Sequence, residues 1–447
     1  MALTGIDIFK KLPKTNCGDC GVPTCLAFAM SLAAGKASLD SCPHVSAEAR
    51  EALGSASAPP IRPFEIGTGD AKVKVGGETV EYRHEKTFVN PPPIAVLISA
   101  GDSDAAIEAK VGKLAELQYE RVGLMLKPEM VAVKDPAGDK LEALVKKVAA
   151  LRQCPMILIS DSVDALKAGA AAAGANKPVL YPVTAANMDA MAALGKETGC
   201  PLGIKADGPE ALAAITEKLM AAGIKDMVLD SGARDIKKVL QDLVTIRRSA
   251  LRSGFRPLGF PTITFPCEMT QDPMKEAMYA ATCIAKYGGI VVLSDLKGET
   301  VFPLLLERLN IYTDPQRPMA TPEGIYEIGK PNEKSPVLIT SNFSLTYFIV
   351  SGEIEASKID SWLLVKDTEG LSVLTGWAAG KFVADAIGPM VKKSGIDAKI
   401  SHKKLIIPGF AAQISGELEE ELPGWEIMIG PREAAHIAAF LKNWTPD

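Results

Sequence analysis

A short strand-like segment followed by a longer amphipathic segment recurs eight times between residues 93 and 313, and this repeat constrains the fold more than any other feature. The longer segments, for example 141–151 and 209–219, carry apolar residues at helical spacing. Strands that are apolar on both faces and alternate with helices form parallel sheets, so eight units predict a (β/α)8 TIM barrel. The expected strands are 94–100, 121–127, 155–161, 178–184, 201–207, 226–232, 261–267 and 289–295.

A second α/β pattern follows the barrel. Residues 314–336 are rich in proline and polar residues, which is typical of a linker. Strand-like runs then occur at 337–342, 362–367, 404–409 and 426–430, and helical patterns occur at 344–357, 375–391, 417–422 and 431–443. Four strands are too few for another barrel, so residues 337–447 are predicted to form an open, doubly wound, Rossmann-like sheet.

Cysteine is unevenly distributed. Four of the eight cysteines lie in residues 1–57, namely Cys17, Cys20, Cys25 and Cys42, and the others occur singly in the barrel. A disulfide scaffold would spread its pairs through a small chain, so this distribution predicts a local cysteine-rich module on a reduced protein. Residues 58–92 are expected to be a linker that contains a β-hairpin, with strands at 72–76 and 78–83 around Gly76 and Gly77.

The four N-terminal cysteines are separated by two, four and sixteen residues, and Pro43 follows the last of them. Zinc sites usually show two similar Cys/His pairs, whereas a cubane cluster tolerates an irregular series. The spacing therefore favours a [4Fe–4S] cluster over structural zinc or a disulfide pair, which remain alternatives. Cys25 begins a predicted helix at 23–34, whose N-terminus would stabilise negative charge on the cluster. His44 is a further ligand candidate but is more simply an exposed polar residue. Such a module can accept and pass on electrons.

Charge and hydropathy narrow the function classes. The chain has 49 basic and 54 acidic residues, a net charge of −5, which argues against a general nucleic-acid or anionic-membrane surface. No window approaches the ~18 uncharged apolar residues of a membrane-spanning helix. The first residues have the wrong order of charged and apolar groups for a secretory signal, so we expect a cytoplasmic protein.

Several segments identify a family. They are Asn-Cys-Gly-Asp-Cys-Gly-Val-Pro-Thr-Cys at 16–25, Cys42 with Pro43, Ile-Thr-Ser-Asn-Phe-Ser-Leu-Thr-Tyr at 339–347 and Gly-Leu-Ser-Val-Leu-Thr-Gly at 370–376. With the three-part organisation, the whole chain resembles the large subunits of corrinoid iron–sulfur proteins of the reductive acetyl-CoA pathway, also called gamma subunits of acetyl-CoA decarbonylase/synthase. The resemblance implies a heterodimer with a smaller barrel subunit. It also implies partnership with a methyltetrahydrofolate methyltransferase, with acetyl-CoA synthase and with a low-potential donor such as ferredoxin.

The resemblance also implies a mechanism and a set of contacts. A cob(I)amide in the C-terminal domain would accept the methyl group and deliver it, while the cluster would reduce inactive Co(II) back to Co(I). Ligands of open α/β sheets bind at the carboxyl ends of the strands, and small residues there would let a flat macrocycle approach the backbone. By similarity, corrinoid contacts are expected at Thr340, Thr346, Gly370, Leu371, Ser372, Val373, Thr375 and Ala434. The alternative is that these residues form ordinary strand-to-helix turns.

No Asp-x-His-x-x-Gly sequence, which supplies the cobalt-ligating imidazole of many corrinoid methyltransferases, occurs in the chain. None of its four histidines, His44, His84, His402 and His436, is followed by glycine three residues later. Losing a strong axial donor favours low-coordinate cobalt. We therefore expect the corrinoid to bind with neither its own base nor a protein histidine on cobalt.

Other motifs have simpler interpretations. Four aspartates lie at the carboxyl ends of predicted barrel strands, where barrel active sites form: Asp161, Asp207, Asp230 and Asp295. Each also precedes a predicted helix, so we expect them to be helix caps rather than catalytic residues. Cys267 is expected to be a buried apolar residue, and the acidic run 417–421 a solvated helix face. The glycine-rich segment 376–382 is one residue short of a phosphate loop and has Phe382 where a hydroxyl is required.

Three rival functions remain open from the sequence. The chain could be an iron–sulfur electron-transfer protein whose C-terminal domain binds flavin or nothing. It could be a barrel methyltransferase that acts directly on a methylpterin, although no barrel residue marks a pterin site. It could also be a zinc-stabilised scaffold subunit.

Overall fold

The computed structural model describes residues 5–33, 37, 39–46, 49, 53, 59–316 and 318–446. The chain divides into two compact units. The first contains Met1–Tyr119 and Leu126–Tyr312, and the second contains Glu120–Met125 and Thr313–Asp447. No helix in the described part of the chain combines the length and the apolar character that crossing a membrane requires.

The described residues between 5 and 46, here called the N-terminal module, contain three helical segments: α1 (Gly5–Lys11), α2 (Cys25–Ala33) and the 3-10 helix η1 (Leu39–Ser41). Apolar side chains of α1 and α2, among them Ile8 and Phe28, form a small core that also contains Cys25 and Cys42. The helix expected at 23–34 therefore forms with Cys25 as its first residue. Residue 34 lies outside the described residues.

A two-stranded antiparallel sheet follows, but its strands are not the expected pair. β1 (Phe64–Ile66) pairs with β2 (Val73–Val75), and η2 (Gly69–Ala71) lies between them. The predicted partner at 78–83 is not a strand, so the expected hairpin was wrong. The alternation of polar and apolar residues at 78–83 does not reflect a strand. Glu78 and Glu81 instead turn inward and form ion pairs with arginines of a barrel helix.

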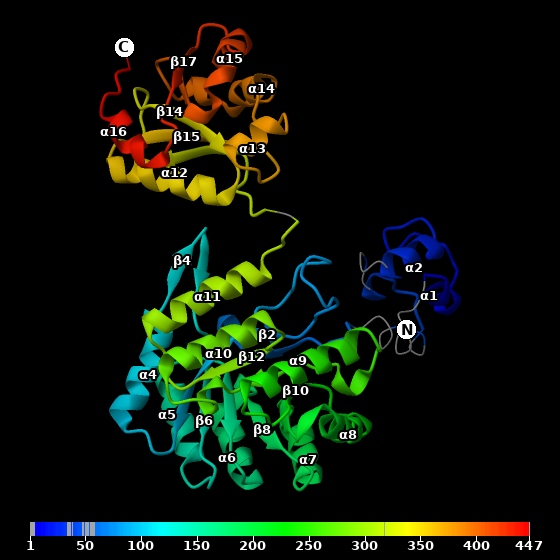
Figure 1. Ribbon diagram of the computed structural model, residues 1–447. Helices are drawn as coiled ribbons and strands as arrows, with labels where there is room; N and C mark the ends of the chain where they lie inside the picture. The colour runs from blue at the N-terminus through cyan, green and yellow to red at the C-terminus, as the bar shows by residue number, and fades with distance from the viewer. Residues whose placement is uncertain are drawn as a thin grey trace. The chain divides into compact units, whose positions relative to one another are not determined.

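Eight parallel strands in the first unit form a nearly closed barrel (Figure 1). Their bounds are β3 (Ile94–Ser99), β6 (Met130–Lys134), β7 (Met156–Ile159), β8 (Val179–Val183), β9 (Leu202–Lys205), β10 (Met227–Asp230), β11 (Ile263–Thr264) and β12 (Ile290–Leu293). Consecutive strands pair, and β12 pairs with β3. A parallel bridge between Leu229 and Thr262 spans the remaining seam, so the predicted barrel is confirmed.

Helices cover the outside of the barrel (Figure 1). They are α4 (Asp104–Glu116), α5 (Leu141–Leu151), α6 (Val163–Ala173), α7 (Met188–Thr198), α8 (Gly208–Ala221), α9 (Ile236–Leu251), α10 (Pro273–Ala285) and α11 (Gly298–Tyr312). Three 3-10 helices lie in the connections: η3 (Gly174–Asn176), η4 (Arg256–Leu258) and η5 (Pro266–Glu268). Strand residues alternate between two cores. One set, including Val131 and Leu158, packs under the helices, and the other, including Ala132 and Ile157, fills the barrel interior.

The second barrel strand differs from the prediction. Residues 121–127 do not join the barrel but form part of a short hairpin, β4 (Tyr119–Arg121) and β5 (Leu124–Leu126). Val122 and Gly123 have positive φ angles of 53° and 72°, which a tight two-residue hairpin turn requires. The true strand is β6, which the prediction missed because the apolar run immediately before it resembled a buried strand.

The second unit contains a five-stranded sheet with the order β13-β15-β14-β16-β17. The strands are β13 (Gly324–Ile328), β14 (Val337–Ser341), β15 (Ser361–Lys366), β16 (Lys404–Ile407) and β17 (Glu426–Ile429). The last four are parallel and correspond to the four predicted runs, whereas β13 pairs antiparallel with β15 at one edge. β13 lies inside the segment expected to be a linker, where flanking prolines concealed a short edge strand.

Helical segments lie on both faces of this sheet. They are α12 (Ser344–Ser357), α13 (Val373–Ala378), α14 (Ala384–Ser394), η6 (Ile396–Ala398), η7 (Gly409–Ile414), α15 (Ser415–Glu421), η8 (Ala434–His436) and α16 (Ile437–Leu441). One apolar core joins the sheet to α12 and α16, and another joins it to α14 and α15. The single helix predicted at 375–391 is two helices, separated where Gly380 has a φ of 71°. The chain leaves β14 for β15 on one side and reaches β16 on the other, so the strand order reverses between β14 and β16.

Candidate functional site

None of the four N-terminal cysteines, all of which lie among the described residues, forms a disulfide, and their exposure is graded. Cys17 is exposed, Cys20 is half-buried, and Cys25 and Cys42 are buried in the core of the N-terminal module. Cys17 and Cys20 lie on the loop between α1 and α2, and Cys42 directly follows η1. The fold therefore brings cysteines from two separate segments into one small module.

Local backbone geometry holds the cysteine loop in place. Gly18 and Gly21 have φ angles of 83° and 82°, a conformation that side chains disfavour, and the N–H of Gly21 donates to the carbonyl of Gly18 at 2.9 Å. The side-chain oxygen of Asn16 accepts a hydrogen bond from the N–H of Cys25 at 2.8 Å, and the N–H of Asn16 donates to Cys25 Sγ at 3.4 Å. Asn16 thus ties the start of the loop to the first turn of α2.

Sulfur positions bear on the choice between zinc and a cluster. In a tetrahedral zinc site with Zn–S bonds of about 2.3 Å, the sulfurs would lie about 3.8 Å apart. Among the described residues, no three of the four cysteine sulfurs come within 4.8 Å of one another. The described side chains therefore do not form a ready-made tetrahedral four-sulfur site for a single ion.

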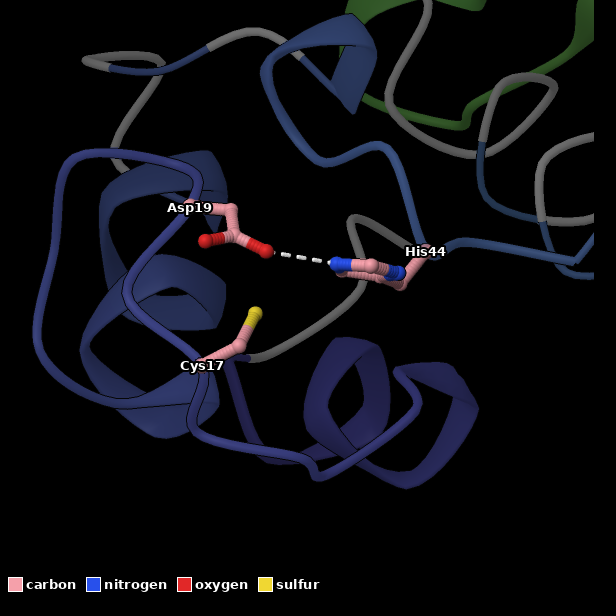
Figure 2. Close-up of side chains that lie close together, drawn as sticks. All are labelled: Cys17, Asp19 and His44. Carbon is pink, nitrogen blue, oxygen red and sulfur yellow. Dashed lines mark hydrogen bonds and ion pairs between the residues drawn. The ribbon is translucent and has the colours of Figure 1, made fainter.

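Cys17 has two polar neighbours. Its sulfur, the Asp19 carboxylate and the His44 imidazole lie within 4.8 Å of one another (Figure 2). His44 Nε2 is 2.6 Å from Asp19 Oδ2, and both side chains are about half exposed. The hydrogen bond from His44, followed by one from Cys17, lowers the pKa of Asp19 below its usual value. His44 is exposed, as expected, but it also links the Cys42 segment to the loop that carries Cys17 and Cys20. The sequence analysis missed Asp19, although it lies between the first two cysteines.

A cavity of about 290 Å3 opens at the carboxyl ends of β14 and β16, where the strand order reverses. Of the eight expected contact residues, five line this cavity: Thr340, Thr346, Ser372, Val373 and Ala434. Open α/β sheets bind ligands at this type of position. Sequence similarity and topology therefore select the same end of the sheet.

The other three expected contacts, Gly370, Leu371 and Thr375, do not line the cavity. Gly370 and Leu371 lie in the loop that leads to Ser372 and α13, whereas Thr375 lies within α13, where its hydroxyl accepts a hydrogen bond from the Ser372 hydroxyl at 3.1 Å. Gly370 has a φ of 78°, and its N–H donates to the side-chain oxygen of Asn342 at 2.9 Å.

Asn342 organises this loop, and the sequence analysis did not single it out. Its side-chain oxygen also accepts hydrogen bonds from the Thr368 N–H at 2.9 Å and the Thr368 hydroxyl at 2.8 Å, while its Nδ2 donates to Asp367. One buried amide therefore fixes the turn after β15 against the end of β14. Its position in the segment 339–347 was the available signal.

The cavity wall is apolar, with a few polar groups. Thr340 is 1% exposed, and its hydroxyl has no hydrogen-bond partner. Around the cavity, Ile349, Leu374 and Phe410 leave 43% to 51% of their surface in solvent, and the exposed Arg432 adds a positive charge. Monomeric proteins rarely leave large apolar side chains grouped in this way unless they bind something. The sequence analysis missed these four residues because each is unremarkable by itself.

The barrel carboxylates do not serve as the expected caps. Asp207 occupies the N-cap position of α8 but makes no side-chain capping bond. Ser162, not Asp161, caps α6. Asp295 instead forms an ion pair with Lys113 at 2.8 Å.

Asp230 belongs to a network across the mouth of the barrel. It is 3% exposed, accepts a 2.6 Å bond from the Tyr181 hydroxyl and forms an ion pair with Arg234. Arg234 also binds Glu268, which binds Lys134 at 2.6 Å. The cavity beside Asp230 and Arg234 measures only about 10 Å3, about the size of one water probe. The charges of Asp230, Arg234, Glu268 and Lys134 therefore pair with one another.

Cys267, at the same end of the barrel, is buried, as expected. Burial raises the pKa of its thiol to about 12, and the nearby carboxylates of Glu268 and Glu276 add to the rise. A thiol with this pKa holds its proton at neutral pH and is a poor nucleophile.

Comparison with known proteins gives consistent matches. A family model described as "CO dehydrogenase/acetyl-CoA synthase delta subunit" matches residues 64–441, and one described as "Putative Fe-S cluster" matches residues 12–44. The chain is 46% identical to the corrinoid/iron-sulfur protein large subunit of Moorella thermoacetica, with 99% of each chain covered. It is 36% identical to acetyl-CoA decarbonylase/synthase complex subunit gamma of Methanopyrus kandleri, covering 99% of this chain and 98% of the relative.

Solved structures give only a slight likeness. Dihydropteroate synthase of Yersinia pestis aligns with 49% of this chain and 92% of its own at 13% identity, with a TM-score of 0.37. A likeness of this size carries no argument about function.

Proposed function

Since the chain belongs to the family of corrinoid/iron-sulfur protein large subunits and acetyl-CoA decarbonylase/synthase gamma subunits, we propose that it carries methyl groups on a corrinoid in the acetyl-CoA pathway. One observation carries the proposal. The same chain combines a small module that holds four cysteines, none of them in a disulfide, with a cavity at the switch point of an open sheet. Neither a simple electron carrier nor a pterin-binding barrel requires both.

The cluster ligands in this proposal are Cys17, Cys20, Cys25 and Cys42. Their spacing along the chain and the iron–sulfur family model over 12–44 support a [4Fe–4S] cluster. Cys25 at the first position of α2 gives the site a helix N-terminus, which favours the negative charge of a thiolate-ligated cluster. The hydrogen bond between Asp19 and His44 would hold the Cys42 segment against the loop.

The corrinoid site in this proposal is the switch-point cavity. The unpaired, buried Thr340 hydroxyl supports a ligand with a polar group at that point, because buried hydroxyls in proteins are normally bonded. The apolar rim of Ile349, Leu374 and Phe410 suits the flank of a large macrocycle. A cavity of about 290 Å3 is smaller than a whole cobamide, so most of the corrinoid would lie outside it. Thr346, Ser372, Val373 and Ala434 would contact it directly. Gly370 and Leu371, in the loop before α13, and Thr375, in α13, would position Ser372 and Val373.

We propose that neither the corrinoid's own base nor a protein histidine ligates the cobalt. None of the cavity-lining residues is a histidine. His402 is buried and its Nε2 lies 2.9 Å from the carbonyl oxygen of Ser335, so its ring has a structural partner. Nitrogen superhyperfine splitting in the Co(II) spectrum of the loaded protein would contradict this assignment.

When bound, the corrinoid supplies a cobalt nucleophile for the methyl group and the cluster supplies single electrons. The chain's residues bind, bury and orient these groups. We propose a smaller barrel subunit, a methyltetrahydrofolate methyltransferase, acetyl-CoA synthase and a low-potential donor such as ferredoxin as partners. The relatives named as subunits of a complex support this set.

We also propose a division of labour along the chain, with a cluster domain at 1–57, a linker at 58–92, the barrel at 93–313 and a corrinoid domain at 337–447. The connection at 314–336 is shorter than its composition suggested, because β13 already begins at Gly324. The satisfied charges at the barrel mouth favour a scaffold role for the barrel over direct catalysis on a methylpterin.

One spectrum of the anaerobically purified protein tests the proposal. Corrinoid bands together with a broad iron–sulfur shoulder are expected. Flavin bands, a cluster alone or a colourless protein would each refute it and would point respectively to a flavoprotein, an electron carrier or a zinc scaffold.

A further inference from the structure

Cys17, Asp19 and His44, here called the Cys17 triad, form a compact group of metal-binding side chains. Figure 2 shows the three side chains pointing toward one another, and one ligand atom from each lies within 4.8 Å of the other two. Among the described residues, no other three cysteine, histidine or carboxylate side chains meet this condition. Only Cys17 is a proposed cluster ligand, so the presence of Asp19 and His44 beside it needs another explanation.

The backbone brings the triad together from two segments. Gly18 lies between Cys17 and Asp19 and has a φ of 83°, so the chain turns at this point. His44 comes from the segment after η1, and its Nε2 lies 2.6 Å from Asp19 Oδ2. Because the pKa of Asp19 is lowered, chiefly by the hydrogen bond from His44, its carboxylate is ionised at neutral pH and can bind a cation.

The spacing of the triad suits a single ion. A tetrahedral ion bound at about 2.0–2.3 Å to nitrogen, oxygen and sulfur holds these ligand atoms about 3.3–3.6 Å apart. His44 Nε2 and Asp19 Oδ2 would therefore separate by about 0.7 Å to admit the ion. Their side chains are 46% and 53% exposed, so little packing opposes this movement. Three protein ligands leave a fourth position for water, whereas structural zinc sites are closed by four.

Exposure separates the triad from the other N-terminal cysteines. Cys25 and Cys42 are buried in the core of the N-terminal module, whereas all three members of the triad are exposed. The sulfur of Cys25 also accepts a hydrogen bond from the N–H of Asn16 at 3.4 Å. An ion that arrives from solvent therefore meets the Cys17 triad before it meets the buried thiols.

We propose that the Cys17 triad binds one Fe²⁺ ion before a cluster is present, through the Cys17 sulfur, an Asp19 oxygen and His44 Nε2. Thiolate and imidazole ligands suit both iron and zinc. Iron is the ion that a cluster on this module requires, and this choice rests on the proposed function.

Binding is a ligand exchange without electron transfer. An iron–sulfur bond replaces the S–H bond of Cys17, and the proton passes to solvent. The imidazole of His44 binds through Nε2 and carries its hydrogen on Nδ1. The iron stays divalent, so the step needs neither an oxidant nor a reductant. Once a cluster holds Cys17, Asp19 and His44 return to their mutual hydrogen bond.

The test is a metal titration of the full-length protein without cluster or corrinoid, under anaerobic and reducing conditions. Co²⁺ is the spectroscopic probe, and Fe²⁺ affinity is measured by competition with a chelator. The wild-type protein should bind one Co²⁺ with the charge-transfer absorption of a single thiolate ligand rather than of four. His44→Gln and Asp19→Asn should each weaken the binding of both ions more than about tenfold, since losing a residue that merely supports a ligand already costs about 10–100-fold.

Two comparisons make the test specific. The glutamine of His44→Gln can still donate a hydrogen bond to Asp19, so its weaker metal binding would not come from loss of that bond. Cys20→Ser is the matched control outside the triad. It should keep the wild-type Co²⁺ affinity and yet form no cluster with iron and sulfide.

Three results would overturn the inference. They are the absorption of four thiolate ligands, a wild-type Fe²⁺ affinity in His44→Gln, and binding of Zn²⁺ without measurable binding of Fe²⁺. If the wild-type protein forms no cluster with iron and sulfide, the proposed function fails instead. The Co²⁺ titration would still decide whether the triad binds a metal.

Discussion

Replacing Thr340 by valine should change two properties in opposite directions. The Thr340 hydroxyl is buried at the wall of the cavity and has no partner within the protein. Valine has nearly the same shape and lacks the hydroxyl. The apo-protein should therefore become more stable, while its affinity for a corrinoid should fall.

The magnitudes follow from burial. Thr340 is 1% exposed, so its hydroxyl loses almost all hydration on folding and gains no bond in return. Burying such a group costs about 1–3 kcal/mol, and its removal should raise the free energy of unfolding by about 1 kcal/mol or more. If the hydroxyl bonds the corrinoid, the same change removes about 1 kcal/mol of binding free energy, or roughly a fivefold rise in Kd.

Two assays separate the effects. Denaturant unfolding of the apo-protein gives the stability change, and calorimetric titration with aquocobalamin gives the affinity change. Ser341→Ala is the matched control. The Ser341 hydroxyl is also buried and unpaired, but Ser341 does not line the cavity. The Ser341→Ala substitution should therefore stabilise the apo-protein and leave its corrinoid affinity unchanged.

The reasoning would be refuted if Thr340→Val destabilised the apo-protein, because the hydroxyl would then have a partner there. It would also be refuted if both variants weakened corrinoid binding equally, since the effect would then be independent of the cavity.

Three further changes probe the other parts of the chain. Cys20→Ala should leave methyl transfer intact once the cobalt is reduced chemically but abolish reactivation by a protein reductant. Unchanged reactivation in a coupled assay would contradict the assignment of Cys20 as a cluster ligand. His44→Ala should speed iron release to a chelator roughly threefold, whereas His44→Gln, which can still donate to Asp19, should restore most of the retention. Burial raises the pKa of Glu268, but hydrogen bonds from Lys134 and Arg234 outweigh burial and leave that pKa below its usual value. The ionised carboxylate therefore stabilises the fold above about pH 4.5, and this contribution is lost as the pH falls through the lowered pKa. Glu268→Gln should accordingly unfold at a lower temperature than wild type at pH 7, and the difference between the two unfolding temperatures should narrow in acid. A difference that stays constant with pH would contradict the stabilising role of the ionised Glu268 carboxylate.

The repeating units of the fold could be predicted, but the pairing of short segments could not. Seven of the eight barrel strands follow from apolar runs, because a strand covered on both faces has few polar residues. The exception, 121–127, is equally apolar, yet Leu124 and Met125 are exposed. Only the positive φ angles at Val122 and Gly123 distinguish this hairpin from a buried strand, and Val122 gives no warning of such a conformation.

Charged side chains at the barrel mouth show a similar limit. An aspartate after a strand and before a helix has the pattern of a cap, but Asp230 and Asp295 pair with Arg234 and Lys113 instead. Lys113 and Asp295 are 182 residues apart in the chain. Local sequence cannot show that such a partner is available, so the capping interpretation failed through tertiary contacts.

The candidate corrinoid site can be located only from the burial of side chains and the strand order of the sheet taken together. Unpaired buried hydroxyls are rare and often mark functional positions, but this rule alone selects Thr340 and Ser341 equally. The structure separates the two hydroxyls, because Thr340 lines the cavity and Ser341 does not. The cavity itself lies where β15 and β16 take opposite sides of β14, an order that the sequence of strands along the chain does not specify. Topology therefore decides which of two chemically similar hydroxyls is positioned to meet a ligand.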